Sequence, residues 1–399
     1  MGGVGGSSAA LPPTLMNFDF SDEERLLAET ARRVVARDVE PVLAKHPQHE
    51  ALPKSVMLDL YRAVADLGYT GARLPEEDGG SGLTHVMLGI LNESLPPVLA
   101  FSLLGHESTI KRIHMGGTPE QRKRFLPDLI AGRKLAGTAA SEPNAGSDPR
   151  GIETTAVPDG DHYVLSGTKL WISNGPIIDT TIVVASLGRD AAGRNLITRF
   201  IVDRAESPFE SREIPTVGLQ QGPLGELHFQ DCRVPKANLL GEPGDAHHAL
   251  TFTWLANRPN IGLFGVHLME KALAASIAHA KQRTQFGSPI GKFQLVQEML
   301  AEMSASIDAS RLLCYRALAL LDKGVWCHRE SSIAKMFATE AALRVTNLAI
   351  QVHGASGLTK EFPLEAWARD ARMLTIPDGT TQIHQLIIGR ELVGLRAFA

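Results

Sequence analysis

The segment "TIPDGTTQIH", residues 375–384, places a carboxylate between a proline and a glycine, followed by two hydroxyl groups and an amide. These residues are Pro377, Asp378, Gly379, Thr380, Thr381 and Gln382. A solvated turn commonly has this composition. A carboxylate in the same place can also act as a general base when it is positioned against a transferable proton. The residues alone leave both interpretations of Asp378 open, a solvated turn residue or a base beside an electron acceptor.

Three earlier segments also combine residues that can contact a ligand. "GTAASEPNAGSDPR" (137–150) is rich in small and hydroxyl residues, so its backbone can approach a ligand closely, although a surface turn has the same composition. "GTKLWISNG" (167–175) includes Trp171, which strand packing would also explain. "RTQFGSPIGKFQ" (283–294) begins with Arg283, either a solvated cation at a helix end or a planar cation that binds phosphate through two hydrogen bonds.

Three zones of the chain must position these segments. Residues 21–134 follow helical patterns, in which Ser21 and Glu24 form a capping box and Thr118 caps a helix that begins with proline. Residues 135–240 contain short β-rich runs separated by turn residues: "HYVLSGTKLWI", "TIVVASL", "LITRFIVDR" and "LGELHFQDCRV". This order predicts a compact antiparallel β domain between two helical domains.

Helical periodicity returns after about residue 246. In "FQLVQEMLAEMSASI" apolar residues recur at spacings of three and four and form one stripe: Phe293, Val296, Leu300, Met303 and Ile307. This stripe and the later helical segments predict a bundle of long antiparallel helices. The predicted fold class is α+β, with a flexible tail, a helical domain, a β domain and a helical bundle over residues 1–20, 21–134, 135–240 and 246–399.

The composition argues against several classes of protein. The 40 basic and 44 acidic residues nearly balance, so no charged surface for nucleic acid or an anionic membrane is expected. No apolar run is expected to span a bilayer. Cys232, Cys314 and Cys327 are odd in number and widely spaced, which favours a reducing compartment over a disulfide scaffold. No HExxH motif occurs, and no metal site is expected.

We expect no targeting signal at either end of the sequence. "MGGVGGSSAALPPT" lacks the basic start and apolar core of a secretory signal and the arginines of a mitochondrial presequence. Its glycines are not a dinucleotide-binding fingerprint, because no predicted strand precedes them and no helix follows. "LRAFA" is not a peroxisomal signal. We therefore expect a cytoplasmic protein from a bacterium.

The chemical segments, together with "QVHGASG" at 351–357, resemble the acyl-CoA dehydrogenase family along nearly the whole chain after residue 20. The match to SEP-x-AGSD at 141–148 is specific. The resemblance implies an acyl-CoA dehydrogenase-like fold, with an N-terminal α-helical domain, a middle antiparallel β domain and a C-terminal four-helix-bundle domain. It also implies FAD as cofactor, an acyl-CoA as substrate, an electron-transfer flavoprotein as acceptor, and a homo-oligomer, typically a tetramer.

The resemblance assigns many of these residues to FAD. It implies that Trp171 packs on the isoalloxazine ring, that Ser173 hydrogen-bonds the hydride acceptor N5, and that Arg283 reaches the FAD pyrophosphate of a neighbouring subunit. The family usually has two consecutive glycines where this chain has a glycine and an alanine. The implied FAD set is Thr138, Ala140, Ser141, Gly146, Ser147, Trp171, Ile172, Ser173, Arg283, Phe286, Gln294, Gln351, Val352, His353, Gly354, Ala355, Thr380, Thr381 and Gln382.

At the position of Asp378, many members of the family keep a glutamate that removes the α-proton of an acyl-CoA. The β-hydrogen then leaves as hydride to flavin N5, and a trans-2-enoyl thioester forms. The resemblance gives the role of base to Asp378. In the family the backbone N–H of the base and a flavin ribityl hydroxyl polarise the thioester carbonyl. The implied substrate-binding residues are Ser147, Arg258 and Gly379, of which Gly379 leaves room for the thioester.

Several positions depart from the family pattern. Aspartate is one methylene shorter than glutamate, so its oxygens retreat by about 1 Å, which can cost about a hundredfold in rate. A second subgroup keeps its glutamate where this chain has Asn257. Charged family positions near CoA are occupied by Leu255 and by Gln220, between Gly218 and Gly222. These changes predict an unusual substrate, such as a branched or cyclic acyl-CoA or a thioester on a carrier protein.

Other activities stay open on the same scaffold. A nitroalkane oxidase-like enzyme would use an aspartate base and oxygen as acceptor, although "GTTQIH" after Asp378 favours the dehydrogenase. Enoyl-thioester reductases run the reaction backwards. A degenerate FAD-binding accessory subunit would explain Gln220 and Leu255, whereas the intact Arg283, Ser147 and Asp378 argue against it.

Overall fold

A computed structural model describes residues 19–395 of the chain. Residues 1–18 of the predicted tail lie outside the described residues. Ser21 and Glu24 form a capping box at α1, and Thr118 caps α6, which confirms both predicted helix starts. The first helical region comprises α1 (Asp22–Val34), η1 (Val35–Val39), α2 (Glu40–Lys45), α3 (Lys54–Ala65), α4 (His85–Ser94), α5 (Pro97–Gly116) and α6 (Pro119–Ile130).

The middle of the chain forms a sheet with the strand order β6-β7-β3-β2-β4-β5-β8, and β1 pairs with β4. The four strands predicted from the sequence are confirmed as β3, β4, β5 and β7. The sheet buries an apolar cluster of its own that includes Leu165, Phe200 and Leu227. The strands are β1 (Ala136–Ala139), β2 (Thr155–Asp159), β3 (His162–Ser173), β4 (Thr180–Arg189), β5 (Asn195–Asp203), β6 (Glu210–Glu213), β7 (Leu224–Pro235) and β8 (Leu239–Leu240).

The sheet is antiparallel apart from two pairings with β4, which the sequence did not predict. β1 runs parallel to β4 from Ala136 opposite Thr180 onward, and β2 meets β4 in parallel at Thr155 opposite Ser186. Because β2 and β3 lie between β1 and β4 in the chain, and β3 lies between β2 and β4, no tight turn forces an antiparallel pairing with β4. The loop at 140–154 therefore begins and ends beside the same strand.

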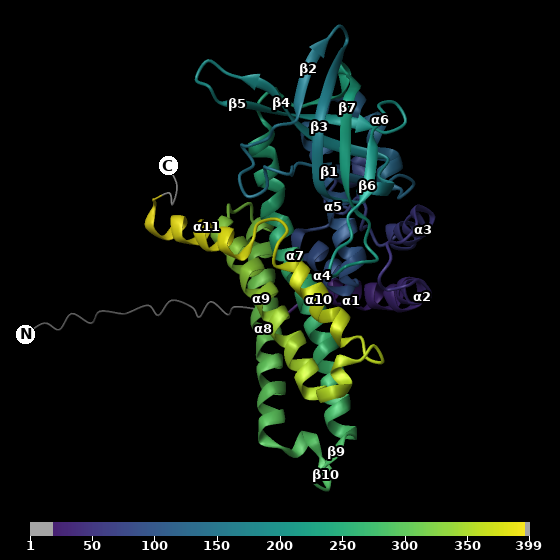
Figure 1. Ribbon diagram of the computed structural model, residues 1–399, viewed down its shortest axis with the longest axis vertical. Coiled ribbons are helices and arrows are strands. Elements are labelled where there is room, and N and C mark those ends of the chain that lie inside the picture. Colours follow the sequence, from purple (N-terminus) through teal and green to yellow (C-terminus); the bar gives the residue numbers. More distant parts are fainter. Residues whose placement is uncertain (1–18, 396–399) are drawn as a thin grey trace, which may run out of the picture.

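Long helices form the C-terminal region, and Met303 and Ile307 of the predicted stripe are buried there. Leu103 of α5, Phe264 of α7 and Leu318 of α8 belong to one buried cluster, so both helical regions share a core. The elements, labelled in Figure 1, are α7 (Ala246–Gln282), β9 (Thr284–Gln285), β10 (Ser288–Pro289), α8 (Gln294–Asp322), α9 (His328–His353), α10 (Leu364–Leu374) and α11 (Thr381–Val393).

One helix has the length and composition of a membrane span. Leu250–Gln282, within α7, has a mean hydropathy of 1.4 in its most apolar window, so the expectation that no run reaches this length is wrong for α7. However, 61% of that window is buried inside the protein, where α5, α8 and α9 pack against the helix. A helix that is apolar all round is typical of a core position. We therefore interpret α7 as the core helix of the bundle.

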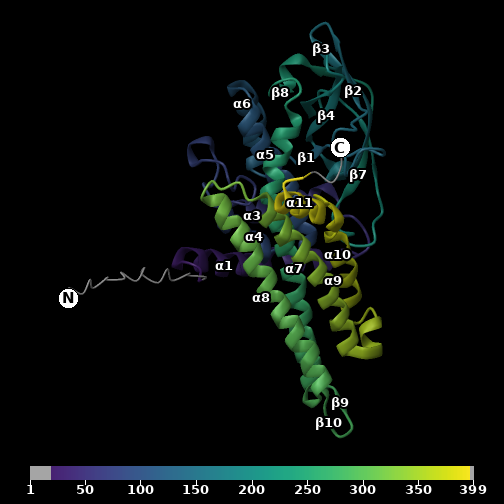
Figure 2. The same ribbon diagram turned by 90° about the vertical axis from the view of Figure 1, so that its left-hand side faces the viewer.

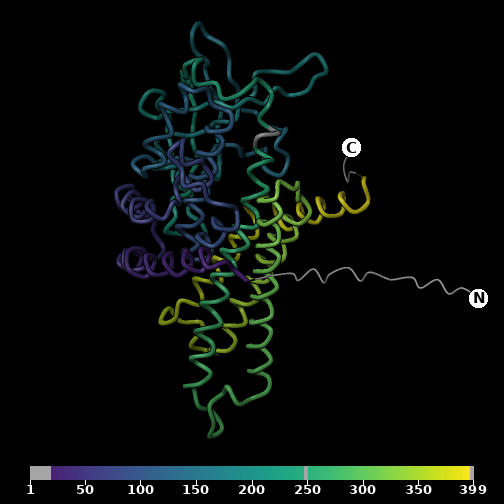
Figure 3. The backbone as a smooth tube through the Cα atoms, turned by 180° about the vertical axis from the view of Figure 1, so that it is seen from behind, coloured from purple at the N-terminus to yellow at the C-terminus, as the bar shows by residue number. Residues whose placement is uncertain are grey.

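The bundle extends away from the sheet, as Figures 1 and 2 show. The sheet lies beside the first part of α7, and the β9–β10 hairpin lies at the opposite end of the molecule (Figure 3). At 1.5 Å per residue, the helix from Arg258 to its C-terminal end at Arg283 spans about 37 Å. The two arginines that were predicted to bind substrate and cofactor therefore lie far apart in one chain.

Candidate active site

Asp378 lies in the turn between α10 and α11. It is half-buried and has a φ of +51°, and Gly379 follows with a φ of +106°. Positive φ values are uncommon outside glycine, although aspartate tolerates them better than most residues. A Cβ on Gly379 would lie 3.1 Å from Cε1 of His384, so the turn requires glycine there. The Thr380 hydroxyl then accepts a hydrogen bond from the Ile383 N–H (3.3 Å) and caps α11.

Two buried cations hold the backbone of this turn. Lys335 of α9 donates from Nζ to the carbonyl oxygens of Thr375 (3.0 Å) and Gly379 (2.6 Å). Arg258 of α7 donates from Nε to the carbonyl oxygen of Asp378 (3.3 Å). Lys335 has an exposed fraction of 0% and Arg258 of 5%. Carbonyls before, at and after the carboxylate-bearing residue are thus tied to two helices of the bundle.

The Asp378 carboxylate interacts electrostatically with three buried cations. Burial lowers the pKa of Arg112 and of Arg258 to about 10, and the pKa of Lys335 to about 7. The Asp378 carboxylate acts in the opposite direction on all three, because a nearby negative charge favours the protonated form of a base. Arg112 also donates to the Thr138 hydroxyl (2.8 Å), a predicted FAD contact. One carboxylate is therefore surrounded by cations from α5, α7 and α9.

A buried ion pair anchors the loop at 140–154. Glu142 accepts hydrogen bonds from Nζ of Lys169 (2.6 Å) and from two backbone N–H groups near the end of the loop (2.6 and 3.0 Å). Lys169 is fully buried. In the middle of the loop, Gly146 and Ser147 are exposed, and a Cβ on Gly146 would meet no atom within 4 Å. The loop is firmly held at its base and leaves space above its predicted ligand contacts.

Trp171 and Ser173 lie at the end of β3. The register between β3 and β7 shifts between Lys169 and Ile172, and Trp171 has a φ of +64°. This bulge re-aims the indole, which leaves 57% of Trp171 exposed, while Ile172 is buried. Ser173 is half-buried beside α5, where a Cβ on Gly105 would lie 3.5 Å from the Ser173 Cβ. An exposed indole beside a hydroxyl suits a flat aromatic ring.

The hairpin residues predicted to bind FAD lie at the far end of the bundle (Figure 1). Arg283 and Phe286 are exposed there, and Phe286 has an exposed fraction of 95%. The Phe286 ring lies 6.0 Å, centroid to centroid, from that of Phe293, next to Gln294 at the start of α8. An exposed phenylalanine and an exposed guanidinium on one short hairpin form a surface suited to another molecule.

The segment 351–355 joins the hairpin group rather than the Asp378 group. His353 stacks on His279, one helical turn before Arg283, with ring centroids 4.2 Å apart. Along α9, about 24 Å separates Lys335 from Gln351. The structure therefore divides the predicted FAD residues into two groups. The first contains Thr138, Ala140, Ser141, Gly146, Ser147, Trp171, Ile172, Ser173, Thr380, Thr381 and Gln382, and the second contains Arg283, Phe286, Gln294, Gln351, Val352, His353, Gly354 and Ala355.

The second family position for the base is filled by a neutral amide that already has a hydrogen-bond partner. Asn257 is buried in α7, and its Oδ1 accepts a hydrogen bond from the Ser108 hydroxyl of α5 (2.8 Å). Leu255 is 1% exposed, in the core. Gln220 accepts a hydrogen bond from Arg369 of α10 (2.7 Å), so its side chain is engaged within the chain. None of these three substituted positions presents a charge to the turn.

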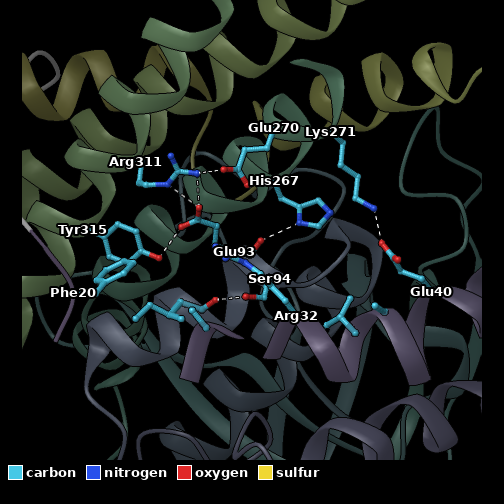
Figure 4. A pocket seen from close by; sticks show the side chains of 14 residues that line it. Phe20, Arg32, Glu40, Glu93, Ser94, His267, Glu270, Lys271, Arg311 and Tyr315 are labelled. Carbon is cyan, nitrogen blue, oxygen red and sulfur yellow. Dashed lines mark hydrogen bonds and ion pairs between the residues drawn. The ribbon is translucent and has the colours of Figure 1, made fainter. Parts of the chain in front are cut away.

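A cavity of about 490 Å³ lies elsewhere, between α1, α4, α7 and α8 (Figure 4). Arg311 contacts Glu93 (2.8 Å) and Glu270, and Lys271 contacts Glu40 (2.5 Å). Among the described residues that line this cavity, none was predicted to bind FAD or substrate. These five charged side chains therefore form ion pairs away from Asp378.

The chain matches three domains of one family in order. The N-terminal domain of acyl-CoA dehydrogenase matches residues 21–133, the middle domain 137–232 and the C-terminal domain 250–393. The chain is 34% identical to the probable acyl-CoA dehydrogenase YngJ of Bacillus subtilis over 388 residues, which cover 95% of this chain and 100% of YngJ. The chain belongs to the acyl-CoA dehydrogenase family.

Solved structures agree with this assignment. Butyryl-CoA dehydrogenase from Megasphaera elsdenii is 31% identical with a TM-score of 0.89, covering 95% of this chain and 100% of that one. PigA, solved with FAD and proline, is 25% identical with a TM-score of 0.88, covering 94% and 99%. The predicted fold is confirmed, and the protein is an FAD-dependent oxidoreductase of the acyl-CoA dehydrogenase family, whose members act on CH–CH groups.

The described residues fit a flavin dinucleotide. Trp171 offers an exposed aromatic face, Ser173 a half-buried hydroxyl, and the loop at Gly146 open space. Arg283 offers an exposed guanidinium for an anionic pyrophosphate. The chain thus carries the donor types that FAD requires, distributed over its two ends.

Sequence reasoning did not single out Lys335, Arg112 or Glu142. The signal for Lys335 was its position, since it lies on the buried face of α9 with Ala338 and Ala342. A fully buried lysine on an apolar helix face is rare and could have been noticed. Arg112 and Glu142 had no comparable signal, because their partners come from distant elements.

Proposed function

We propose that Asp378 is the general base of a dehydrogenation in which an acyl-CoA thioester becomes its trans-2-enoyl product. The half-buried Asp378, in a turn held by Lys335 and Arg258, is the observation that best supports this role. A carboxylate fixed in one place is suited to removing a carbon-bound proton. At the alternative family position, the Asn257 amide cannot act as a base.

The α C–H bond breaks, and its proton moves to the Asp378 carboxylate. The β C–H bond breaks with its electron pair, which leaves as hydride, and the electrons of the α C–H bond form the new double bond. FAD supplies the hydride acceptor when bound. Trp171 and Ser173 would hold the flavin ring, and the backbone N–H of Asp378 would donate to the thioester oxygen, where negative charge develops.

On the substrate side, the proposal uses Ser147, Arg258 and Gly379. Nη1 of Arg258 is buried and has no hydrogen-bond partner within residues 19–395, so it can donate to an incoming carbonyl or hydroxyl group. Leu255 is buried and Gln220 is hydrogen-bonded to Arg369, so the contacts to the group that carries the acyl chain differ from the family pattern. We propose a branched or cyclic acyl-CoA.

The two groups of FAD residues support a site shared between subunits. In this proposal Arg283, Phe286, Gln294 and residues 351–355 bind the ADP half of FAD held mainly by a second copy of the chain. The protein is then a homo-oligomer, for which we propose a tetramer. An electron-transfer flavoprotein in the cytoplasm is the proposed acceptor.

An anaerobic titration tests the reaction and its base. Oxidised-flavin absorbance is followed while butyryl-CoA, isobutyryl-CoA and cyclohexanecarbonyl-CoA are added in turn to the wild-type enzyme and to Asp378→Asn. We expect isobutyryl-CoA or cyclohexanecarbonyl-CoA to bleach the wild-type flavin, and Asp378→Asn to retain its absorbance. Bleaching of Asp378→Asn at the wild-type rate would refute the role of Asp378.

The same titration separates the alternatives. A flavin that none of the acyl-CoAs bleaches, but that a carrier-protein thioester or a nitroalkane bleaches, would replace the acyl-CoA reaction with one of those activities. Preferential bleaching by butyryl-CoA would contradict the branched or cyclic substrate and leave the reaction class in place.

A further inference from the structure

Lys335 is an unusual residue for the interior of this bundle. Its exposed fraction is 0%, and both of its hydrogen bonds go to backbone carbonyls, those of Thr375 and Gly379. Burying an ammonium group is costly unless it is paired and hydrogen-bonded, and an apolar side chain of similar length would often fill such a site at lower cost. The bundle keeps a charge here that its packing does not require.

The two carbonyls that Lys335 binds lie on either side of Asp378. Thr375 is the C-cap of α10, and Gly379 precedes the N-cap of α11. Between them the chain passes through positive φ at Asp378 and Gly379, a conformation that persists only when its surroundings hold it. Lys335 therefore closes the base of the turn, and Arg258 holds its middle.

We propose that Lys335 is a positioning residue that fixes the Asp378 turn and places a positive charge opposite its carboxylate, an inference that rests on the proposed role of Asp378 as base. The shorter side chain of aspartate makes this important. Its oxygens lie about 1 Å further back than those of glutamate, and a misplacement of that size can cost about a hundredfold in rate. A turn held at both ends keeps the carboxylate at one height above the substrate.

Four charged or titratable side chains face Lys335. Asp378 favours its protonated form, Arg258 of α7 opposes it, and Glu340 of α9 favours it. His384 of α11 is also near enough for Lys335 to lower its pKa, which burial brings to about 2. Burial dominates for Lys335 and lowers its pKa to about 7. The ammonium is therefore present below about pH 7 and is lost as the pH rises above it.

The test is the rate of anaerobic flavin bleaching by the acyl-CoA that reacts in the titration above, measured from pH 6 to 9. Lys335→Met keeps the length of the side chain and removes the charge, whereas Lys335→Arg keeps a charge at every pH. Lys271→Met is the matched control, because Lys271 pairs with Glu40 at the remote cavity. FAD content and thermal stability are recorded for each variant.

We expect the wild-type rate to fall as the pH rises through about 7. Lys335→Met should bleach about a hundredfold more slowly at pH 6 and lose this pH dependence, with FAD content preserved. Lys335→Arg should keep its rate up to pH 9, and Lys271→Met should match the wild type. A purely structural lysine would alter stability but not the pH profile.

Three outcomes would overturn the inference. They are a wild-type rate that does not fall above pH 7, a Lys335→Met rate equal to the wild type, and a Lys335→Arg profile with the wild-type decline. If Lys335→Met fails to bind FAD, the profiles of the wild type and Lys335→Arg decide. Failure of the proposed function is distinguishable, because it appears as bleaching of Asp378→Asn at the wild-type rate or as a wild-type flavin that no acyl-CoA bleaches.

Discussion

Two clusters of charged side chains in this enzyme are organised in opposite ways. Beside the cavity of Figure 4, Arg311 lies between the carboxylates of Glu93 and Glu270. At the turn between α10 and α11, Lys335 and Arg258 instead bind backbone carbonyls. The first group pairs cation with anion directly, whereas the second directs two cations at a segment that carries one carboxylate.

The pKa values follow from this difference. Burial lowers the pKa of Arg311, but Glu93 and Glu270 more than offset burial, and the net pKa is raised. Burial lowers the pKa of Arg258 to about 10 despite the nearby charge of Asp378. The charge of a cation that is paired with carboxylates is largely neutralised by them. The charge of a cation that binds only backbone carbonyls can still stabilise a nearby anion such as the Asp378 carboxylate. Cavity volume alone would have favoured the cavity of Figure 4 as the active site, whereas the arrangement of charges favours the turn at Asp378.

The largest expected difference between the two clusters is obtained by neutralising one carboxylate in each. Asp378→Asn should lower the rate of flavin bleaching by about 10² to 10⁴, because a general base contributes that much. Glu93→Gln should leave the rate near the wild-type value and destabilise the fold by about 1 to 3 kcal/mol, since the buried Glu93 loses its charged hydrogen bonds to Arg311 and Tyr315 while Arg311 keeps Glu270. Stopped-flow bleaching and urea unfolding measure the two effects. A reversed pattern would refute the comparison.

A second test at the turn changes the side-chain length of the base. Asp378→Glu adds one methylene and should lower the bleaching rate by up to about a hundredfold, because the turn and pocket are matched to the shorter side chain. The rates of both enzymes are compared at saturating acyl-CoA. A faster Asp378→Glu would show that the pocket retains the geometry of the glutamate enzymes.

The two ends of the chain can be tested against each other by mixing. Arg283→Ala should lose FAD, because a pyrophosphate contact is removed. If Arg283 serves the partner's site, mixed pairs of subunits carrying Arg283→Ala and Asp378→Asn should recover about half of the wild-type activity, since each mixed pair contains one intact site of two. Co-expression with two affinity tags provides the mixed enzyme. No recovery would mean that Arg283 acts within its own chain.

The smallest effect concerns stability and pH. Since burial lowers the pKa of Lys335 from 10.5 to about 7, the unfolded chain binds a proton in this window that the folded chain lacks. The free energy of unfolding should therefore rise by about 2 to 3 kcal/mol from this group between pH 7 and 9. Urea unfolding of the wild type and of Lys335→Met measures the difference. An equal rise in both would contradict a buried, depressed lysine.

Local patterns predicted much of the fold. The caps at Ser21 and Thr118 and the strands from His162 to Val234 follow from side chains within a few residues of each other, so the sequence was sufficient. The parallel pairing of β1 with β4 was missed, because no local turn encodes it. The expectation that no apolar run could span a bilayer was wrong for α7, because its few polar residues interrupt the apolar pattern without ending the helix.

By itself, the sequence determined the family, the order of the domains and the candidate base, since these depend on residue types at short spacings. Only the tertiary structure decided which groups surround Asp378. Lys335 and Arg258 belong to other helices, and helix packing brings them to the turn. The division of the FAD residues between two ends of the bundle also depends on the path of α7 and α9. Contacts between distant segments depend on the packed core, which no short pattern specifies.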